Sequence, residues 1–329
     1  MEPASTPPRT RLAPSPTGAL HLGNARTFLI TWALARANGW RIVMRVEDLD
    51  TPRVKPETID QALRDLEWLG VDYDEGPIIQ SRDLEHHVEA MAALAANGLA
   101  YPCELTRTQI EAAASAPHDA PTADDAPGHE VRFPSSLRPA DWSAPRPFES
   151  RETNWRFACP DAPKGLVEFD DLFAGPQRMT PADTIGDFVA WTKRGTPSYQ
   201  LAVVVDDQRQ RVTHVVRGDD LLDSAARQTL LYRALGFGPP PTYLHLPLVK
   251  GADGRRLAKR HGDTRLSHYR ARGVPPERIV ALLARWSGVE DASEQAMSAA
   301  EFASRLALDR IPRTPITFTP DDDAWLLAR

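Results

Sequence analysis

Hydrophobic and polar residues near the start of the chain follow a pattern that predicts a strand, a helix and a second strand. The first strand begins at Arg11, a loop follows over Pro14 to Gly18, and an amphipathic helix is expected from about Asn24 to Asn38. Arg41 to Val46 alternates with β-branched residues and leads into a run of acids. A strand, helix, strand unit of this kind favours a parallel sheet that binds its ligand at the carboxyl ends of the strands.

Later segments supply the remaining elements of an α/β chain. The continuous apolar run Leu201 to Val205, which ends in two acids, is typical of a buried parallel strand. Helices are expected at Pro56 to Leu69, Asp83 to Asn97, Asp223 to Leu235, Pro275 to Ser287 and Ala299 to Leu308, and further strands at Val212 to Val216 and Tyr243 to Val249.

The middle of the chain, from about Leu99 to Asp187, differs from this pattern and is interpreted as an insertion. It contains short strand-like pieces at Asn154 to Ala158 and Gly165 to Phe169. Ala112 to Glu130 is rich in Ala, Pro, Asp and His and offers almost nothing to bury, so a mobile loop is expected there. The parallel sheet is expected to resume after the insertion.

Composition changes this picture only by excluding some classes of protein. The chain has 329 residues with 42% apolar content, enough for one large catalytic domain with insertions or for two domains. No apolar run approaches the length of a membrane span, and Met1 to Thr10 lacks the apolar core of a signal peptide, so a cytoplasmic protein is expected. Cys103 and Cys159 are too few for a disulfide framework, and both are expected to be reduced thiols.

The charge of the chain does not resemble that of a protein that coats nucleic acid. Its formal net charge is −6, whereas non-specific affinity for nucleic acid comes from Lys and Arg that neutralise phosphates. A local basic patch still allows an RNA partner, and arginines are dense at Arg132 to Arg156 and Arg255 to Arg272. Those arginines are equally explained as a solvated face.

Ala13 to Asn24 has the residues of a phosphate-binding loop. Two prolines stiffen the loop, Gly18 and Gly23 permit close approach of a ligand to the backbone, and the loop leads into a helix start that favours an anion. His21 is placed to donate to a phosphate oxygen whose charge grows during displacement at phosphorus. The alternative is an ordinary tight turn in which His21 caps the helix.

A second candidate site is the glycine-flanked loop Gly254 to Gly262, far away in sequence. A basic loop near the sheet edge can complete a split phosphate site, where Lys259 offsets charge on a departing pyrophosphate. A solvated charged loop is the other interpretation of such a run. Within six positions the loop carries four cations, namely Arg255, Arg256, Lys259 and Arg260.

Together the two loops resemble the signature pair of class I aminoacyl-tRNA synthetases, with His21 to Asn24 in place of the first signature and Arg256 to Arg260 in place of the second. The resemblance is closest to the glutamyl-tRNA synthetase branch and is weakest between Leu105 and Glu152. It rests, in order and spacing, on Arg11 to Gly18, Arg45 to Asp50, Tyr199 to Asp207 and Val216 to Leu221. The fold that it implies is the Rossmann-type parallel nucleotide-binding sheet of these enzymes.

Carried over by position, the resemblance implies a pocket for L-glutamate and a site for ATP with Mg²⁺. Glutamate presents two carboxylates and one ammonium, so arginines and one acid suit it, and surface ion pairs at strand ends are the weaker interpretation of these charges. The implied glutamate-binding residues are Arg11, Ala13, Ser15, Glu47, Tyr199 and Arg217, with Glu47 at the ammonium. The implied ATP-binding residues are Gly18, His21, Gly23, Asn24, Arg256, Leu257, Ala258, Lys259 and Arg260, of which His21 and Lys259 are catalytic.

Some positions depart from the pattern of the branch. Asn24 replaces the second histidine of the first signature, and Arg256 and Ala258 replace the usual Lys and Ser of the second. Short members of the branch often carry zinc on a Cys-x-Cys pair, but only Cys103 is present at this point of the chain. His118 and His129 lie in the expected mobile loop, so zinc is not expected.

The chain ends about 70 residues after Lys259, room for a few helices only. It therefore resembles the short members of the branch, which lack an anticodon-binding domain, and this resemblance implies activation of glutamate without tRNA and its transfer to queuosine in the anticodon loop of tRNA(Asp). There are two alternatives: a truncated enzyme that charges a tRNA 3′ end, and a non-catalytic relative that binds a nucleotide or RNA. The protein is expected to be a monomer. The expected segments are a lead at 1–10, the two halves of the catalytic domain at 11–98 and 188–262, an insertion at 99–187 with a loop near 112–130, and a helical stem remnant at 263–329.

Overall fold

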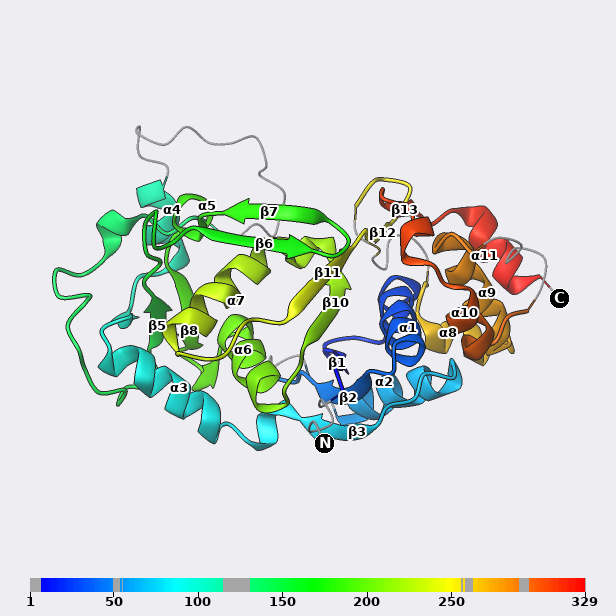
Figure 1. Ribbon diagram of the computed structural model, residues 1–329, viewed down its shortest axis with the longest axis horizontal. Helices are drawn as coiled ribbons and strands as arrows, with labels where there is room; N and C mark the ends of the chain where they lie inside the picture. Colours follow the sequence, from blue (N-terminus) through cyan, green and yellow to red (C-terminus); the bar gives the residue numbers. More distant parts are fainter. Residues whose placement is uncertain are drawn as a thin grey trace, which may run out of the picture.

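The computed structural model describes residues 7–49, 54, 56–114, 131–255, 257, 263–289 and 296–328. A parallel layer lies at the centre of the molecule, between an inserted sheet on the left of Figure 1 and helices α8 to α11 on the right. It consists of β1 (Arg9–Leu12), β2 (Arg41–Val46), β3 (Glu75–Ile79), β10 (His214–Gly218) and β11 (Thr242–Leu246). Because apolar runs such as that of β2 are buried on both faces, the strands favour this parallel arrangement.

Two parallel ladders meet at β1 to form this layer. One has the order β1, β2, β3 with Arg11 opposite Val43, and the other joins β10 to β11. The backbone N–H of Thr213 donates to the carbonyl oxygen of Arg9 at 2.9 Å, so β10 starts beside β1. The carboxyl ends of β1, β2 and β10 therefore meet at one edge, as the sequence predicted for the first two strands.

Helix α1 (Leu22–Ala37) is the expected helix after the first loop, but it is not amphipathic. None of its residues before Ala37 is exposed, because it lies between the parallel strands and helices α9 and α10. Even Arg26 is buried on it, where its guanidinium donates to the carbonyl oxygen of Pro247 at 2.9 Å. Burial lowers the pKa of Arg26 to about 10.

The apolar run Leu201 to Val205 is not a strand, and this prediction was wrong. It lies inside helix α6 (Tyr199–Arg209), whose residues from Gln200 to Asp207 are all buried. The helix packs against α3, α7 and β8, so apolar side chains are needed around its whole circumference. A short run that is apolar on every side has no periodicity from which a helix and a buried strand can be told apart.

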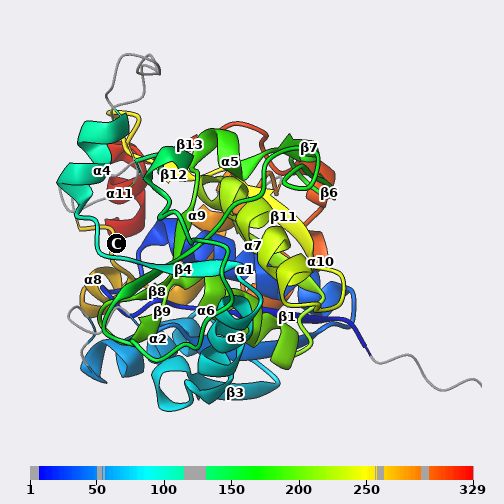
Figure 2. The same cartoon turned by 90° about the vertical axis from the view of Figure 1, so that its left-hand side faces the viewer.

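The inserted segment forms a separate antiparallel sheet and a hairpin. Viewed from that end of the molecule, α3 lies below this sheet (Figure 2). β8 and β9 pair within this sheet, so its strands continue past Asp187 to Pro197. The sheet has the order β4 (Ala100–Cys103), β5 (Asn154–Phe157), β8 (Phe188–Thr192) and β9 (Thr196–Pro197), and the hairpin joins β6 (Val167–Asp171) to β7 (Gly175–Met179).

Most of the other expected elements are confirmed within a few residues, although the last expected strand divides into β11 and β12. The start of the expected loop, Ala112 to Ala114, belongs to a helix, and 115–130 lies outside the described residues. The remaining helices are α2 (Pro56–Trp68), α3 (Glu85–Ala96), α4 (Arg107–Ala114), α5 (Pro181–Thr184), α7 (Leu222–Ala234), α8 (Leu266–Ala271), α9 (Pro276–Trp286), α10 (Ala299–Arg305) and α11 (Pro320–Leu327). Two short strands, β12 (Val249–Lys250) and β13 (Ile316–Thr317), pair with each other.

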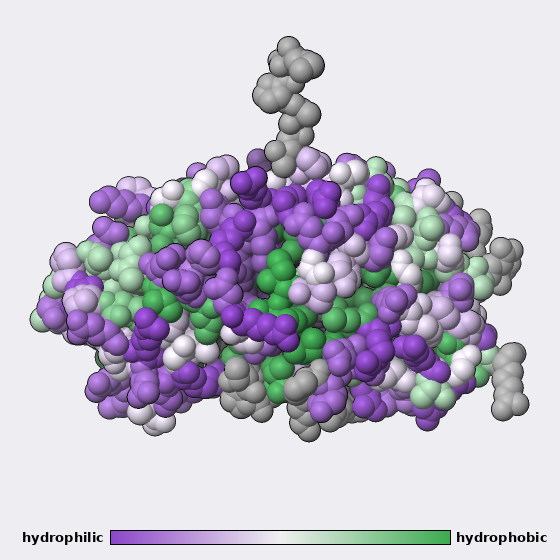
Figure 3. Space-filling view, turned by 90° about the horizontal axis from the view of Figure 1, so that it is seen from below, coloured by the Kyte–Doolittle hydropathy of each residue, from purple (hydrophilic) through white to green (hydrophobic). Residues whose placement is uncertain are grey.

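Seen from below, a hydrophobic area lies near the middle of the surface and is bordered by hydrophilic side chains (Figure 3). In the part of the chain that the structure describes, no helix is long and apolar enough to cross a membrane. Cys103 and Cys159 are buried free thiols, as expected.

Candidate active site

A cavity of about 320 Å³ opens where the carboxyl ends of β1, β2 and β10 meet the start of α1. Residues from five separate stretches of the sequence line it, because the parallel strands end at the same edge. The lining includes nine of the residues singled out from the sequence, namely Arg11, Ala13, Ser15, His21, Gly23, Asn24, Glu47, Tyr199 and Arg217.

Other predicted residues are not part of this lining. Leu257 is 5% exposed, packs in the main hydrophobic core and does not line the cavity. Gly18 does not line the cavity, and a Cβ added there would meet no atom within 4 Å. Arg256, Ala258, Lys259 and Arg260 lie outside the described residues, and their assignment to ATP stays a prediction.

The sequence analysis missed several residues that complete the cavity. Thr27 and Phe28 lie one helical turn beyond Gly23 and Asn24, so helical spacing places them on the same face of α1. Asp220 lies directly after β10, within the stretch Val216 to Leu221 that supports the family resemblance, but the sequence analysis gave this residue no role. Leu248 and Val249 follow β11 and had no sequence signal, because only the fold brings them to the same edge.

The start of α1 forms the polar end of the cavity. His21 is the N-cap of the helix, and its Nδ1 accepts a hydrogen bond from the N–H of Gly23 at 3.1 Å. The backbone N–H of His21 donates to Oδ1 of Asn24 at 2.8 Å. Because Nδ1 is an acceptor, the neutral ring carries its proton on Nε2, the atom able to donate to an anion. His21 therefore caps the helix and is also a candidate for phosphate binding.

Gly23 is required by this arrangement. A Cβ at this position would lie 3.0 Å from Cε1 and 3.1 Å from Nδ1 of the His21 ring. Contacts this short would push the imidazole out of its position at the helix N-terminus, where the positive end of the helix dipole favours a phosphate. The glycine thus keeps the histidine ring in its capping position.

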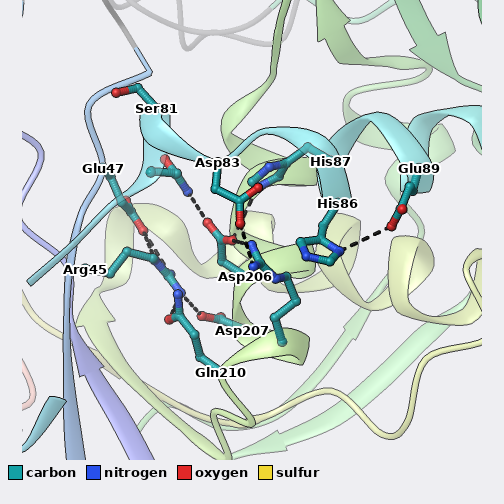
Figure 4. Close-up of polar contacts among 12 residues, drawn as sticks. Arg45, Glu47, Ser81, Asp83, His86, His87, Glu89, Asp206, Asp207 and Gln210 are labelled. Atoms are coloured by element: carbon teal, nitrogen blue, oxygen red, sulfur yellow. Dashed lines mark hydrogen bonds and ion pairs between the residues drawn. The ribbon is translucent and has the colours of Figure 1, made fainter. Parts of the chain in front are cut away.

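The opposite end of the cavity is built around buried charges, shown in Figure 4. Arg45 has no exposed side-chain area, and its guanidinium donates to Oδ1 of Asp207 at 2.7 Å and to Oε1 of Glu47 at 3.0 Å. Burial disfavours the charged guanidinium, but the carboxylates of Asp207 and Glu47 outweigh it and raise the pKa of Arg45. Arg45 thereby fixes one carboxylate oxygen of Glu47 at the cavity wall.

Glu47 and Arg11 supply opposite charges to the cavity. The Glu47 side chain is 9% exposed, and burial raises its pKa in spite of the nearby guanidinium groups of Arg45 and Arg11. Arg11 lies with Nε 3.8 Å from Oδ1 of Asp207, and its Nη1 donates to the carbonyl oxygen of Val216 at 3.3 Å. Burial lowers the pKa of Arg11, and the Asp207 carboxylate opposes that effect.

Arg217 provides a second buried cation with a defined orientation. Its Nε donates to Nε2 of His245 at 2.9 Å, Nη1 donates to Oε1 of Gln228 at 3.0 Å, and Nη2 donates to the carbonyl oxygen of Leu221 at 3.2 Å. A guanidinium has five N–H groups, and three are used by these contacts. The remaining two suit a carboxylate bound in the cavity.

A second cavity of about 720 Å³ adjoins the first and shares Ser15, Glu47 and Tyr199 with it. Tyr199 is 37% exposed and lies at the boundary between the two. Burial raises the pKa of its hydroxyl, so the ring stays neutral. The second cavity has apolar, amide and cationic walls, which include Phe188, Pro197, Gln80, Asn154, Lys193 and Arg227.

The part of the chain where related enzymes were expected to hold zinc is apolar. Cys103 is buried with Tyr101, Ile110 and Phe133. Burial raises the pKa of the Cys159 thiol to about 12, which disfavours the thiolate that binds metals. The described residues contain no group of three or more His, Cys, Asp or Glu that could hold a metal, while His118 and His129 lie outside them.

Comparisons with known proteins agree on one family. The model of the catalytic domain of class I tRNA synthetases (E and Q) matches residues 8–321. The chain is 47% identical to a glutamyl-Q tRNA(Asp) synthetase of Symbiobacterium thermophilum, over 96% of this chain and 97% of that protein. It is 48% identical to a protein of the same name from Rhodopirellula baltica, over 88% of this chain and 87% of that protein.

A solved structure extends the agreement to the fold. Glutamate-tRNA synthetase from Elizabethkingia anophelis superposes with a TM-score of 0.78 and 25% sequence identity, over 98% of this chain and 70% of that one. The parallel layer with its inserted sheet is thus the Rossmann-type fold expected from the sequence.

The first prediction concerns the buried charges. Asp207→Ala leaves Arg45 and Arg11 buried without their shared carboxylate, so the free energy of unfolding should fall by about 3 to 5 kcal/mol. Urea denaturation measures this, with Gln208→Ala as the control, because Gln208 is exposed near the C-terminal end of the same helix. The control should change stability by less than about 0.5 kcal/mol. Equal stability of both variants would contradict the proposed dependence on Asp207.

The second prediction is that the purified protein contains no stoichiometric zinc. A structural zinc site takes four ligands, and Cys103 is surrounded by apolar side chains. Metal analysis after purification without chelators should therefore give far less than one zinc per chain. A value near one would contradict this and would direct attention to His118 and His129.

Proposed function

The chain belongs to the family of class I tRNA synthetases for glutamate and glutamine, and we propose that it activates L-glutamate with ATP without needing tRNA and then transfers it to queuosine in tRNA(Asp). The observation that carries the proposal is a single cavity in which two buried arginines and one carboxylate face a helix start suited to phosphate. That combination of charges matches an amino acid with two carboxylates and one ammonium, bound beside a nucleotide.

In this proposal, Arg11 and Arg217 bind the two carboxylates of glutamate and Glu47 binds the ammonium. Arginine suits a carboxylate because its planar donors bind both oxygens. Arg45 holds Glu47 by one oxygen, which keeps the acid in place while its charge is available to the ammonium. Ala13 and Ser15 complete the pocket beside this group.

Activation is an in-line attack by the α-carboxylate of glutamate on the α-phosphorus of ATP, with pyrophosphate as the leaving group. Nε2–H of His21 stabilises the negative charge that develops on the phosphate oxygens, and the positive end of the α1 dipole adds to this effect. Lys259 is proposed to offset charge on the pyrophosphate. Mg²⁺ would accompany the phosphates, where it typically keeps few protein ligands.

The second cavity is the proposed entry for the acceptor. It touches the glutamate pocket at Tyr199 and Glu47, so a hydroxyl placed there reaches the activated carboxyl group. Its apolar walls suit an unstacked base, and Lys193 and Arg227 suit the phosphates of an RNA loop. The acceptor hydroxyl attacks the mixed anhydride, the new ester forms, and AMP leaves.

The names of the relatives favour queuosine over the 3′-terminal adenosine as the acceptor. The two relatives at 47% and 48% identity are glutamyl-Q tRNA(Asp) synthetases. An enzyme that charges the tRNA 3′ end is the competing function, since the solved relative is a glutamate-tRNA synthetase. A non-catalytic relative is a third possibility, which exchange of labelled pyrophosphate into ATP distinguishes from both enzymes.

The third prediction tests the end of the cavity that is proposed to bind the phosphates of ATP. Gly23→Ala places a methyl group against the His21 ring, so glutamate-dependent pyrophosphate exchange should slow on the order of tenfold to a hundredfold. Gly238→Ala is the control, because an added Cβ there meets no atom within 4 Å. A Gly23→Ala enzyme as fast as this control would show that the histidine position does not matter for activation.

The fourth prediction tests the acceptor. RNA-free enzyme should catalyse glutamate-dependent exchange, and labelled glutamate should attach to tRNA(Asp) with queuosine but not to the same tRNA with guanosine. A site that binds the queuosine diol leaves its polar groups unpaired when the diol is absent. The control is the same tRNA without its 3′-terminal adenosine, because periodate oxidation of the 3′-terminal ribose would also cleave the queuosine diol.

Each outcome of this experiment separates the candidate functions. Attachment that survives removal of the 3′-terminal adenosine supports transfer to queuosine. Transfer to unmodified tRNA(Glu), abolished by that removal, would instead identify an enzyme that charges the 3′ end. Exchange that appears only after tRNA is added would contradict activation without tRNA.

A further inference from the structure

A buried chain of three side chains connects the inserted hairpin to Arg217. Nδ1 of His245 lies 2.6 Å from Oδ2 of Asp171, and Nε2 of the same ring lies 2.9 Å from Nε of Arg217. Neither His245 nor Asp171 has any exposed side-chain area. Asp171 ends β6 in the insertion, His245 is on β11 and Arg217 is on β10, so three segments of the chain contribute.

The contacts determine which nitrogen of His245 carries the proton. Arg217 Nε can only donate, so Nε2 of the ring must accept, and the proton of neutral His245 lies on Nδ1. Asp171 accepts this Nδ1–H with Oδ2. Burial and the adjacent Arg217 cation lower the pKa of His245, in spite of the Asp171 carboxylate, and so favour the neutral ring.

Asp171 is itself held firmly by the backbone. Its Oδ1 accepts hydrogen bonds from the N–H groups of Phe173 at 2.9 Å, Ala174 at 2.6 Å and His245 at 3.2 Å. The turn that follows β6 is tied to β11 as well, because Leu172 N–H donates to the carbonyl oxygen of Tyr243 at 2.9 Å. The carboxylate is therefore held in one orientation, and its hydrogen bond to Nδ1 in turn fixes the orientation of the imidazole ring.

We propose that Asp171 and His245 are positioning residues that orient the guanidinium of Arg217 for a carboxylate of glutamate. Without an acceptor at its Nε, Arg217 keeps only its hydrogen bonds to Gln228 and Leu221, so the guanidinium is less firmly oriented for a carboxylate in the cavity. Neither residue lines that cavity, so both act through Arg217. The inference rests on the proposed role of Arg217 in glutamate binding.

Two substitutions at one position test the acceptor directly. The amide of His245→Gln reaches the position of Nε2 and offers an oxygen to Arg217, whereas the amide of His245→Asn reaches only Nδ1 and leaves Arg217 Nε unpaired. His245→Asn should raise the KM for glutamate about tenfold in the exchange assay, and His245→Gln should recover most of that loss. The KM for ATP should change less than about twofold in both.

Asp171→Asn supplies a second route that keeps the shape of the side chain. Its amide can accept the three backbone N–H groups with the oxygen and then presents NH₂ to His245. The proton of the ring must then move to Nε2, where it opposes Arg217 Nε–H. This variant should also raise the KM for glutamate selectively, and it keeps the proposal testable if His245→Asn does not fold.

Arg217→Lys distinguishes a failure of the positioning role from a failure of the proposed glutamate-binding role of Arg217. If its KM for glutamate equals that of the unmodified enzyme, Arg217 does not bind glutamate and both proposals fall together. If Arg217→Lys raises that KM but His245→Asn and Asp171→Asn do not, the glutamate assignment stands and the positioning role is refuted. Equal losses in His245→Asn and His245→Gln, or a matching rise in the KM for ATP, would also refute it.

Discussion

Compensation of two buried arginines by one carboxylate is the interaction on which the cavity depends. Arg45 and Arg11 both lie against Oδ1 of Asp207, at 2.7 and 3.8 Å, and all three side chains are almost fully buried. A buried charge without a partner is costly, so the helix that carries Asp207 has to lie directly behind β1 and β2. The position of α6 relative to the sheet is fixed by charge as well as by packing.

This constraint explains how a chain interrupted by an insertion forms one site. The strands β1 and β2 precede the insertion, and α6 and β10 follow it. Asp207 ties α6 to the two early strands, while Asp171 and His245 tie the inserted hairpin to Arg217 on β10. The insertion thus contributes a wall of the second cavity and a support for the first.

Sequence patterns located the site better than they located every element. Arg11, Glu47 and Arg217 all follow or end a strand, and parallel strands bring such residues to one edge, so their meeting in one cavity was predictable. Leu201 to Val205 was misassigned because the same five apolar residues satisfy a helix buried on all sides and a buried strand. His21 shows that two interpretations of a motif can hold together, since its capping geometry also sets the proton on Nε2.

Local patterns in the sequence were sufficient to predict the parallel unit around the first loop and the charges of the cavity, because strand and loop signals are local. The order of the motifs along the chain was sufficient to identify the family resemblance. Packing in three dimensions was needed to establish that Arg45 holds Glu47, that Asp207 serves two arginines and that His245 meets Arg217. The partners can lie far apart in the sequence, as Arg11 and Asp207 do. Burial and hydrogen-bond geometry across such separations depend on how the elements pack, and no local pattern in the sequence encodes that packing.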